Sequence, residues 1–308
     1  MLAPLILFVY NRPTHTNIVL DKLKLIKEVK DTVLYVFCDG PKQFHTENDL
    51  NNIEQVKKII SDVNFFKEKI VFYNEINQGL ANSVINGVSE VLRIHDKVIV
   101  LEDDIVPEKG FLKYMNEALY TYQDVQEIGC IHGWNYTFKK NVIKTTTFLL
   151  KGADCWGWAT WKRSWDLFEK DGYKLKQEIE NKDLVFSFNR NGTHPFYEML
   201  TDQIHGKNDS WAIRWHASLF LANKFCLQPK YPIVKNIGFD GSGTHCGNEE
   251  IYQITTKFIN LNKSTLFVED DQFYKSFEFG LLNKPSSFTF YYFKNLFYSI
   301  INLIKIKL

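Results

Sequence analysis

The first hundred residues alternate between short apolar runs and segments with helical spacing, and this alternation restricts the fold more than any other feature. The apolar runs read LILFV, TVLYVF, KIVFY and KVIVLE. Continuous apolar runs separated by helical segments are typical of βα units whose parallel sheet is buried on both faces. The sequence therefore predicts an α/β fold that begins with a doubly wound half.

Polar residues follow the four predicted strands at the points where they end. These exits read Asn11-Arg12-Pro13, Asp39-Gly40-Pro41, Asn77-Gln78-Gly79 and Glu102-Asp103-Asp104. Ligands of such sheets bind in the crevice beyond the carboxyl ends of the strands, so we expect these side chains to meet on one rim. One basic group with several carboxylates and amides suits a nucleotide that is bound together with a metal.

The stretch VIVLEDDIVPEKGF carries three consecutive carboxylates at the fourth exit. Side chains alternate along an extended strand, which predicts Glu102 and Asp104 on one side and Asp103 on the other. Hard cations such as Mg²⁺ or Mn²⁺ take oxygen ligands and are often held by one or two carboxylates with substrate phosphates. The alternative is a solvated acidic turn or a cluster at the N-terminus of the next helix. The polar groups that follow the other three strands favour the metal site over these alternatives.

Composition and charge disfavour several classes of protein. The 308 residues are 45% hydrophobic and 15% aromatic, which is typical of a globular chain. The net charge of +1 argues against nucleic acid as the partner. Five cysteines without a CxxC pair fit a reducing compartment better than a disulfide framework. We expect no signal peptide, and no apolar run reaches the roughly 20 residues that span a bilayer.

The apolar pattern becomes irregular after about residue 125. Residues 126–260 have too little periodicity for an independent domain, so we expect them to pack on residues 1–125 and complete the site. Residues 261–308 form a C-terminal extension that ends in SSFTFYYFKNLFYSIINLIKIKL. Aromatic residues beside lysines predict an amphipathic tail that lies in a membrane interface. A terminal helix packed on the protein's own core is the alternative.

Six tryptophans lie between residues 156 and 215, more than routine packing requires. Flat aromatic faces with a polar edge suit sugar rings. We therefore expect Trp156 and Trp158, with Gly157 between them, to line a sugar, and Trp211 to contribute to the same surface. Large aromatic residues are usually core residues, so packing is the alternative for each of them.

Seven stretches together resemble the bacterial relatives of N-acetylglucosaminyltransferase I. In order over about residues 3–250 they are FVYNRP, FCDGP, NQGLANSVINGV, VLEDDIVP, CWGWATW, DSWAIRW and NIGFDGSGTH. The resemblance implies an inverting glycosyltransferase of the GT-A fold, which is built on a Rossmann-like doubly wound sheet. It makes residues 1–125 the nucleotide-sugar-binding half and residues 126–260 the half that binds the acceptor and carries the catalytic base.

The resemblance also implies roles for individual residues. Asp104 matches the metal ligand of the family, while Glu102 and Asp103 match contacts to the sugar and ribose of the donor. The other residues that match the donor pocket are Arg12, Asp39, Gln78 and Gly79. His245 follows the DGSG turn and is a further candidate for the metal or the diphosphate, with a purely structural role as the alternative.

The family's catalytic base precedes a tryptophan, and the stretch DSW places it at Asp209. Relatives often carry a further acid where this chain has Ala212, which leaves Asp209 as the candidate and Asp202 in reserve. Inverting transfer needs one carboxylate that removes a proton from the acceptor hydroxyl, while Mn²⁺ or Mg²⁺ stabilises the leaving diphosphate. The alternative role for Asp209 is the N-cap of the following helix.

Together these features predict a metal-dependent enzyme that moves a hexose or N-acetylhexosamine from a UDP-sugar to a surface-glycan or lipid-linked saccharide. We expect it at the cytoplasmic face of a bacterial membrane. A sugar nucleotidyltransferase would share the architecture, but its glycine-rich, lysine-bearing loop is missing. A non-catalytic carbohydrate-binding module would explain the tryptophans and not the acidic rim. An oxidoreductase is disfavoured because no GxGxxG turn follows the first strand.

Overall fold

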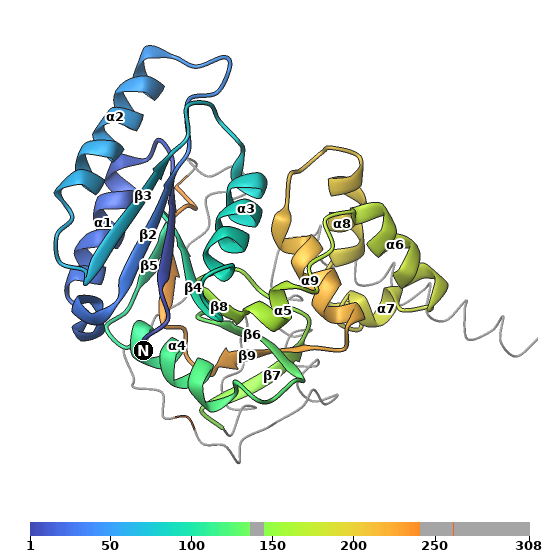
Figure 1. Ribbon diagram of the computed structural model, residues 1–308. Helices are drawn as coiled ribbons and strands as arrows, with labels where there is room; N and C mark the ends of the chain where they lie inside the picture. The colour runs from blue at the N-terminus through green and yellow to red at the C-terminus, as the bar shows by residue number, and fades with distance from the viewer. Residues whose placement is uncertain (136–144, 241–260, 262–308) are drawn as a thin grey trace, which may run out of the picture.

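An eight-stranded, mostly parallel sheet forms the centre of the protein, as Figure 1 shows for a computed structural model that describes residues 1–135, 145–240 and 261. The strand order is β3-β2-β1-β4-β8-β6-β9-β7. The strands are β1 (Leu5–Val9), β2 (Val33–Cys38), β3 (Glu68–Tyr73), β4 (Lys97–Glu102), β6 (Ile128–His132), β7 (Thr147–Lys151), β8 (Trp158–Trp161) and β9 (Phe225–Pro229). The predicted α/β class with a doubly wound parallel half is confirmed.

The first four strands run parallel and in register, which sets their exits side by side. Leu7 of β1 lies opposite Val36 of β2 and Leu101 of β4. β8 runs antiparallel to both of its neighbours, β4 and β6, and β7 runs antiparallel to β9. The chain thus reverses direction next to the strand that carries the acidic triplet, Glu102–Asp104, and the second half of the chain extends the same sheet.

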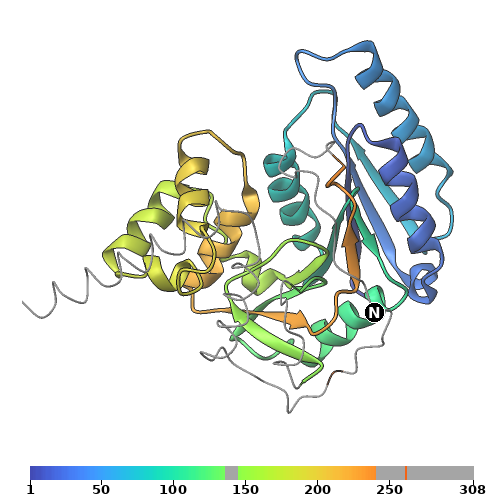
Figure 2. The same cartoon turned by 180° about the vertical axis from the view of Figure 1, so that it is seen from behind.

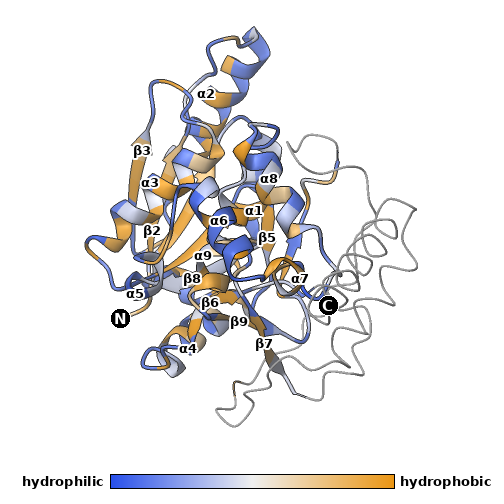
Figure 3. Ribbon diagram, turned by 90° about the vertical axis from the view of Figure 1, so that its right-hand side faces the viewer, coloured by the Kyte–Doolittle hydropathy of each residue, from blue (hydrophilic) through white to orange (hydrophobic). Residues whose placement is uncertain are grey.

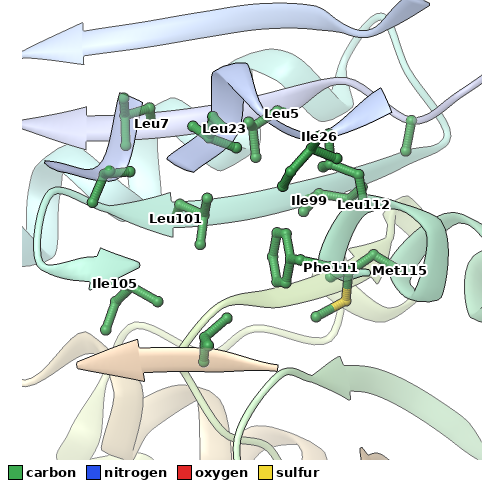
Figure 4. Packing of buried hydrophobic residues seen from close by; sticks show 14 of the residues in the cluster. Leu5, Leu7, Leu23, Ile26, Ile99, Leu101, Ile105, Phe111, Leu112 and Met115 are labelled. Carbon is green, nitrogen blue, oxygen red and sulfur yellow. The ribbon is translucent and has the colours of Figure 1, made fainter. Parts of the chain in front are cut away.

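Helices cover both faces of the sheet, and alternate residues of β1 point to opposite faces. Leu5 and Leu7 pack with α1 (Pro13–Lys24), α2 (Glu47–Asp62) and α4 (Phe111–Thr121), as Figure 4 shows for part of this cluster. Ile6 and Phe8 pack with α3 (Leu80–Leu92) on the other face. This two-sided burial explains why the strands read as continuous apolar runs.

Local sequence explains where the helices near the rim begin. Pro13 is the first residue of α1, a position that has no need of a backbone N–H donor. α2 begins with a capping box in which Thr46 and Asp49 satisfy each other's backbone N–H groups. The loop of residues 10–12 between β1 and α1 is short, and the loop of residues 39–46 between β2 and α2 is longer, but both begin at a strand end and so keep their first polar side chains at the rim.

A group of helices from the second half forms a lobe beside the sheet (Figures 1 and 2). It consists of α6 (Gly172–Asn181), α7 (Val185–Phe188), α8 (Phe196–Ile204) and α9 (Trp211–Leu221), after the short α5 (Lys162–Trp165). Ile213 and Phe220 of α9 pack inside this lobe, whereas Trp211 and Trp215 pack against the sheet side. One helix therefore joins the lobe to the sheet.

Figure 3 shows apolar residues concentrated in the strands and on the inner sides of the helices. Within the described ranges, no helix is long and apolar enough to cross a membrane. The remaining described elements are the 3₁₀ helix η1 (Lys27–Asp31) and the two strands of a small antiparallel sheet, β5 (Ile105–Pro107) and β10 (Val234–Asn236). The expected membrane-interface tail lies outside the described residues.

Candidate active site at the strand exits

Arg12 connects the exit of the first strand to the acidic triplet. It is the N-cap residue of α1, and its guanidinium Nη2 contacts Oδ1 of Asp103 while Nη1 lies 3.1 Å from Oδ2 of Asp104. The side chains of Arg12, Asp103 and Asp104 are only 20%, 5% and 12% exposed. A buried charge needs such a partner, so the arginine and both aspartates form one interdependent unit.

The two aspartates do not follow the alternation expected of an extended strand. β4 ends at Glu102, and residues 103–104 form a turn before β5 begins at Ile105. The prediction that Asp103 faces away from Asp104 was therefore wrong, because both carboxylates lie at the same guanidinium. A turn permits this and a pleated strand does not.

Glu102 is in a different protonation state from an ordinary surface carboxylate. Burial, followed by the negative charges of Asp104 and Asp103, raises its pKa to about 8, although Arg12 opposes the shift. Burial also raises the pKa of Asp103, again against the effect of Arg12. Burial thus favours the protonated form of Glu102, which can both donate a hydrogen bond to a sugar hydroxyl and accept one from it.

Residues 236–240 lie directly on the acidic turn. The backbone N–H of Ile237 donates to the carbonyl oxygen of Asp104 at 2.9 Å. A Cβ atom on Gly238 would lie 2.5 Å from Oδ2 of Asp104, so any larger residue there would displace the carboxylate. Asp240 in turn reaches Nε2 of His15, at 3.2 Å, on the first turn of α1. This segment links the second half of the chain to the rim.

Asp39 holds the loop that follows β3. Its carboxylate accepts backbone N–H groups from Gln78 at 2.8 Å and from Gly79 at 3.2 Å, and also binds the amide of Asn74 at 3.2 Å. The backbone of Gly40 approaches this loop so closely that a Cβ atom would lie 2.7 Å from its main-chain atoms. Asp39, Gln78 and Gly79 are thus together at the rim, as predicted, and Asp39 fixes the conformation of the other two.

Asp209 lies next to this loop and is not a helix cap. The N-cap of α9 is Ser210, whose hydroxyl accepts the N–H of Ile213 at 3.2 Å. The carboxylate of Asp209 is 64% exposed, lies 3.8 Å from Nη2 of Arg214, and would be 3.5 Å from a Cβ atom on Gly79. The capping alternative for Asp209 was wrong, which leaves its carboxylate available beside the loop of residues 77–79.

The reserve candidate for a base is placed differently. Asp202 lies on α8, where its carboxylate pairs with Lys207 at 2.8 Å.

The tryptophans divide into one half-buried residue and a buried cluster. Trp158 and Trp211 are 0% and 3% exposed, and their ring centroids are 5.2 Å apart. A ring without an exposed face cannot stack on a sugar, so both belong to the core, contrary to expectation. Gly157 is also buried and has a φ of +60°, and a Cβ atom there would lie 2.7 Å from Val234. Its role is to permit close packing.

Trp156 keeps part of its surface exposed and lies close to the acidic triplet. Its ring contacts those of Trp134 and Phe239 edge to face, at 5.4 and 5.6 Å between centroids. Burial raises the pKa of the neighbouring Cys155 thiol, and the charges of Asp154, Glu102 and Asp104 add to the shift. Phe239 belongs to the segment of residues 236–240 that lies on the acidic turn, and a Cβ atom on Gly157 would lie 3.4 Å from Ile105, so residues 156–157 lie next to the triplet. Trp156 is therefore the expected aromatic residue that the structure brings to the rim.

Several residues at the rim were not foreseen from the sequence. Gly238 and Asp240 lie within the stretch NIGFDGSGTH, which had been singled out as a whole, so a signal for them existed. His15 and Asp154 stand in no distinctive pattern, and only the fold brings them to the site.

The described residues of this site offer oxygen ligands to a divalent metal but do not form a complete set of ligands. Among residues 1–135, 145–240 and 261, no group of three or more His, Cys, Asp or Glu side chains is arranged to hold a metal. Asp104 offers one carboxylate that already lies near Arg12. This fits an ion held by a single carboxylate together with phosphate oxygens of a bound nucleotide. His245, the other expected ligand, lies outside the described residues.

Comparisons with known proteins give likenesses in structure only. No family model matches the chain, and no curated protein matches it. S. aureus TarS matches with a TM-score of 0.30 and 17% identity over 45% of this chain and 24% of that one. A structure of TarS 1–349 matches with a TM-score of 0.33 and 13% identity, over 59% of this chain and 49% of that one. A structure of GalNAc-T7 with UDP, GalNAc and Mn²⁺ matches with a TM-score of 0.44 and 11% identity, over 75% of this chain and 42% of that one. The chain spans less than half the length of each.

Proposed function

We propose that the protein is a glycosyltransferase that moves a sugar from a nucleotide diphosphate sugar to a hydroxyl group of a saccharide. One observation carries the proposal: Arg12, the acidic triplet and Trp156 come together at the carboxyl ends of parallel strands. That edge of an open α/β sheet is where nucleotides bind. An arginine and aspartates suit a diphosphate with a divalent ion, and an aromatic face suits a sugar.

The groups at the rim divide between the two parts of the donor. Arg12 places a positive charge beside the diphosphate, and Asp104 would hold Mn²⁺ or Mg²⁺ together with phosphate oxygens. When bound, such an ion stabilises the negative charge that develops on the leaving diphosphate. The carboxyl group of Glu102 is suited to a hydroxyl of the sugar, and the exposed part of Trp156 to its ring face. A UDP-linked hexose or N-acetylhexosamine is the donor we propose.

Asp209 is the group that we assign to the acceptor. In an inverting transfer its carboxylate removes the proton of the acceptor hydroxyl, whose oxygen bonds to the anomeric carbon as the bond from that carbon to the diphosphate breaks. The exposed carboxylate and its place beside Gly79 support this role. The nucleotide loop and the proposed base are then neighbours, as a donor and acceptor that react must be.

The first experiment is a calorimetric titration with UDP and other nucleoside diphosphates, with and without Mn²⁺, followed by a screen of nucleotide sugars for hydrolysis. We expect Mn²⁺-dependent binding of one nucleotide and slow release of that nucleotide from its sugar conjugate. Binding of glycans alone would point to a carbohydrate-binding module. Formation of a nucleotide sugar from a sugar phosphate and a nucleoside triphosphate would point to a nucleotidyltransferase. Either result contradicts the proposal.

Asp209→Asn tests the assignment of the base. The variant should bind nucleotide with the affinity of the wild type and lose transfer by about 10²–10⁴-fold, because proton removal contributes rate and not binding. Asp202→Asn is the matched control, since that carboxylate pairs with Lys207 on the lobe surface. Near-normal turnover in Asp209→Asn, or an equal loss in Asp202→Asn, would sink the assignment.

The acceptor and the location of the enzyme are supported by the sequence alone. We propose a surface glycan or lipid-linked saccharide as acceptor, at the cytoplasmic face of a bacterial membrane, with contact through the aromatic and basic C-terminal tail. A chain that ends before about Ser286 should leave the membrane fraction and keep its nucleotide-sugar hydrolysis. Unchanged partition of the truncated chain would refute the role of the tail.

A further inference from the structure

A buried histidine lies behind Trp156. His132 is the last residue of β6, and its side chain has no exposed surface. Nε2 of the ring lies 3.0 Å from the backbone nitrogen of Trp156, and Nδ1 lies 2.9 Å from Oε1 of Gln228 on β9. The ring thus connects two strands of the sheet to the loop that presents Trp156.

These contacts fix the protonation state of His132. A backbone N–H can only donate, so Nε2 must carry the lone pair and accept the N–H of Trp156. Nδ1 then carries the proton and donates it to Oε1 of Gln228. Burial lowers the pKa of His132, and although Asp154 opposes this shift, Arg190 adds to it. The ring is accordingly neutral near pH 7 with its proton on Nδ1.

Charged groups surround the same loop. Oδ1 of Asp154 lies 3.5 Å from Nε2 of His132 and accepts the N–H of Cys155 at 3.0 Å. Oδ2 of Asp154 lies 3.8 Å from the buried Arg190. If Nε2 gained a proton, it would become a donor that faces Asp154, and the N–H of Trp156 would lose its acceptor. The hydrogen bond to Trp156 exists only with the neutral ring.

We propose that His132 is a positioning residue that holds Trp156 in the orientation in which the indole meets the sugar. It does so by accepting the N–H of Trp156 at Nε2 while Gln228 fixes its proton at Nδ1. This inference rests on the proposed function, in which Trp156 contacts the sugar of the donor. His132 itself is buried and touches neither.

Two polar variants separate the two hydrogen bonds of His132. The short amide of His132→Asn can donate to Gln228 from near the Nδ1 position, but it cannot reach Trp156 as Nε2 does. The longer side chain of His132→Gln brings an amide oxygen near the Nε2 position and should restore the acceptor. His95→Asn is the control, because His95 bonds Tyr35 at 2.9 Å near the other end of the sheet.

The first measurement needs no ligand. In His132→Asn, amide exchange over residues 153–158 and thiol labelling of Cys155, resolved by peptide mass spectrometry, should both become faster by about fivefold or more. His132→Gln should approach the wild-type rates, and His95→Asn should leave them unchanged. Wild-type rates in a folded His132→Asn chain would overturn the proposal, because the loop would then not depend on this bond.

The second measurement connects the bond to sugar recognition. His132→Asn should raise KM for the nucleotide sugar by about 5–10-fold, which corresponds to the loss of one hydrogen bond, with UDP affinity unchanged. The rise should disappear in a Trp156→Ala background, whereas general destabilisation would persist there.

The outcomes distinguish the proposals. If the wild type binds a nucleotide sugar and His132→Asn leaves KM for that sugar unchanged, the role of His132 fails and the proposed function stands. If the wild type binds none, the proposed function fails, and the role of His132 in sugar recognition fails with it.

Discussion

Two regions of this protein bury unusual side chains, and they do so for opposite reasons. At the rim, Arg12, Asp103 and Asp104 are charged and mostly buried, and each depends on the others for a partner. In the tryptophan cluster, formed by Trp158, Trp165, Trp211 and Trp215, the rings pack with centroids 5.0–6.1 Å apart. Burial there removes apolar area from water.

This contrast indicates which region is free to perform chemistry. A buried ion pair contributes little net stability, so its presence at a strand exit points to a use other than folding. The tryptophan cluster has an adequate explanation in packing, because it fills the space between α3, α5 and α9. The unusual composition of both regions is visible in the sequence, but only the rim calls for a functional explanation.

The strongest test of the contrast between rim and tryptophan cluster compares the stability and activity of Trp158→Ala with those of Trp156→Ala. Trp158 is fully buried, so its truncation should lower the free energy of unfolding by about 3–5 kcal/mol, measured by urea denaturation. Trp156 is half-buried, and its truncation should cost less than half as much while abolishing selectivity among nucleotide sugars. Equal losses of stability in the two variants would remove the distinction between core and site.

Arg12→Leu should reduce stability by about 3 kcal/mol, because it leaves two mostly buried aspartates without a counter-charge. Nucleotide binding should fall as well. Arg93→Leu provides the control: this arginine pairs with Glu90 at 2.7 Å on the surface, and an exposed pair contributes at most about 1 kcal/mol. If both variants lost the same stability, the rim would be an ordinary surface pair.

Glu102→Gln should stabilise the protein above neutral pH. The pKa of Glu102 is about 8 in the folded chain against 4.5 ordinarily, so the folded state binds more protons between these values and wild-type stability declines as pH rises through this window. The variant, which does not titrate, should gain stability relative to wild type between pH 4.5 and pH 8, by up to about 1.4 kcal/mol per pH unit, and nothing at pH 4.

Thermal unfolding from pH 4 to pH 9 measures the difference. Glu117→Gln, at an exposed pair with Lys113 on α4, should show no such trend. A difference between Glu102→Gln and wild type that is independent of pH would show that Glu102 titrates normally.

Gly238→Ala should have the smallest effect on stability, about 1 kcal/mol, because the added Cβ presses on Oδ2 of Asp104. The rate of Mn²⁺-dependent hydrolysis should fall by more than this loss of stability accounts for. Gly110→Ala is the matched control, because no atom lies within 4 Å of a Cβ atom there. Hydrolysis at the wild-type rate in Gly238→Ala would show that residues 236–240 do not affect the proposed metal site.

The rim could be predicted because its placement is a local property of the chain. The apolar runs identify the strands, the parallel arrangement aligns their ends, and whatever follows each strand meets at one edge. The tryptophans could not be assigned in the same way. Whether Trp158 or Trp156 faces solvent depends on which surfaces α9 and α3 cover, and that is decided by contacts between segments far apart in sequence.

The sequence by itself determined the α/β class, the order of the first four strand–helix units and the gathering of Arg12, Asp39 and Asp104 at one edge. Periodicity and strand exits depend on neighbours in the chain, so the residues reveal them directly. The tertiary structure alone decided that Asp103 and Asp104 share one arginine and that His132 stands behind Trp156. Each of these depends on a turn or a long-range contact, whose geometry no local pattern encodes.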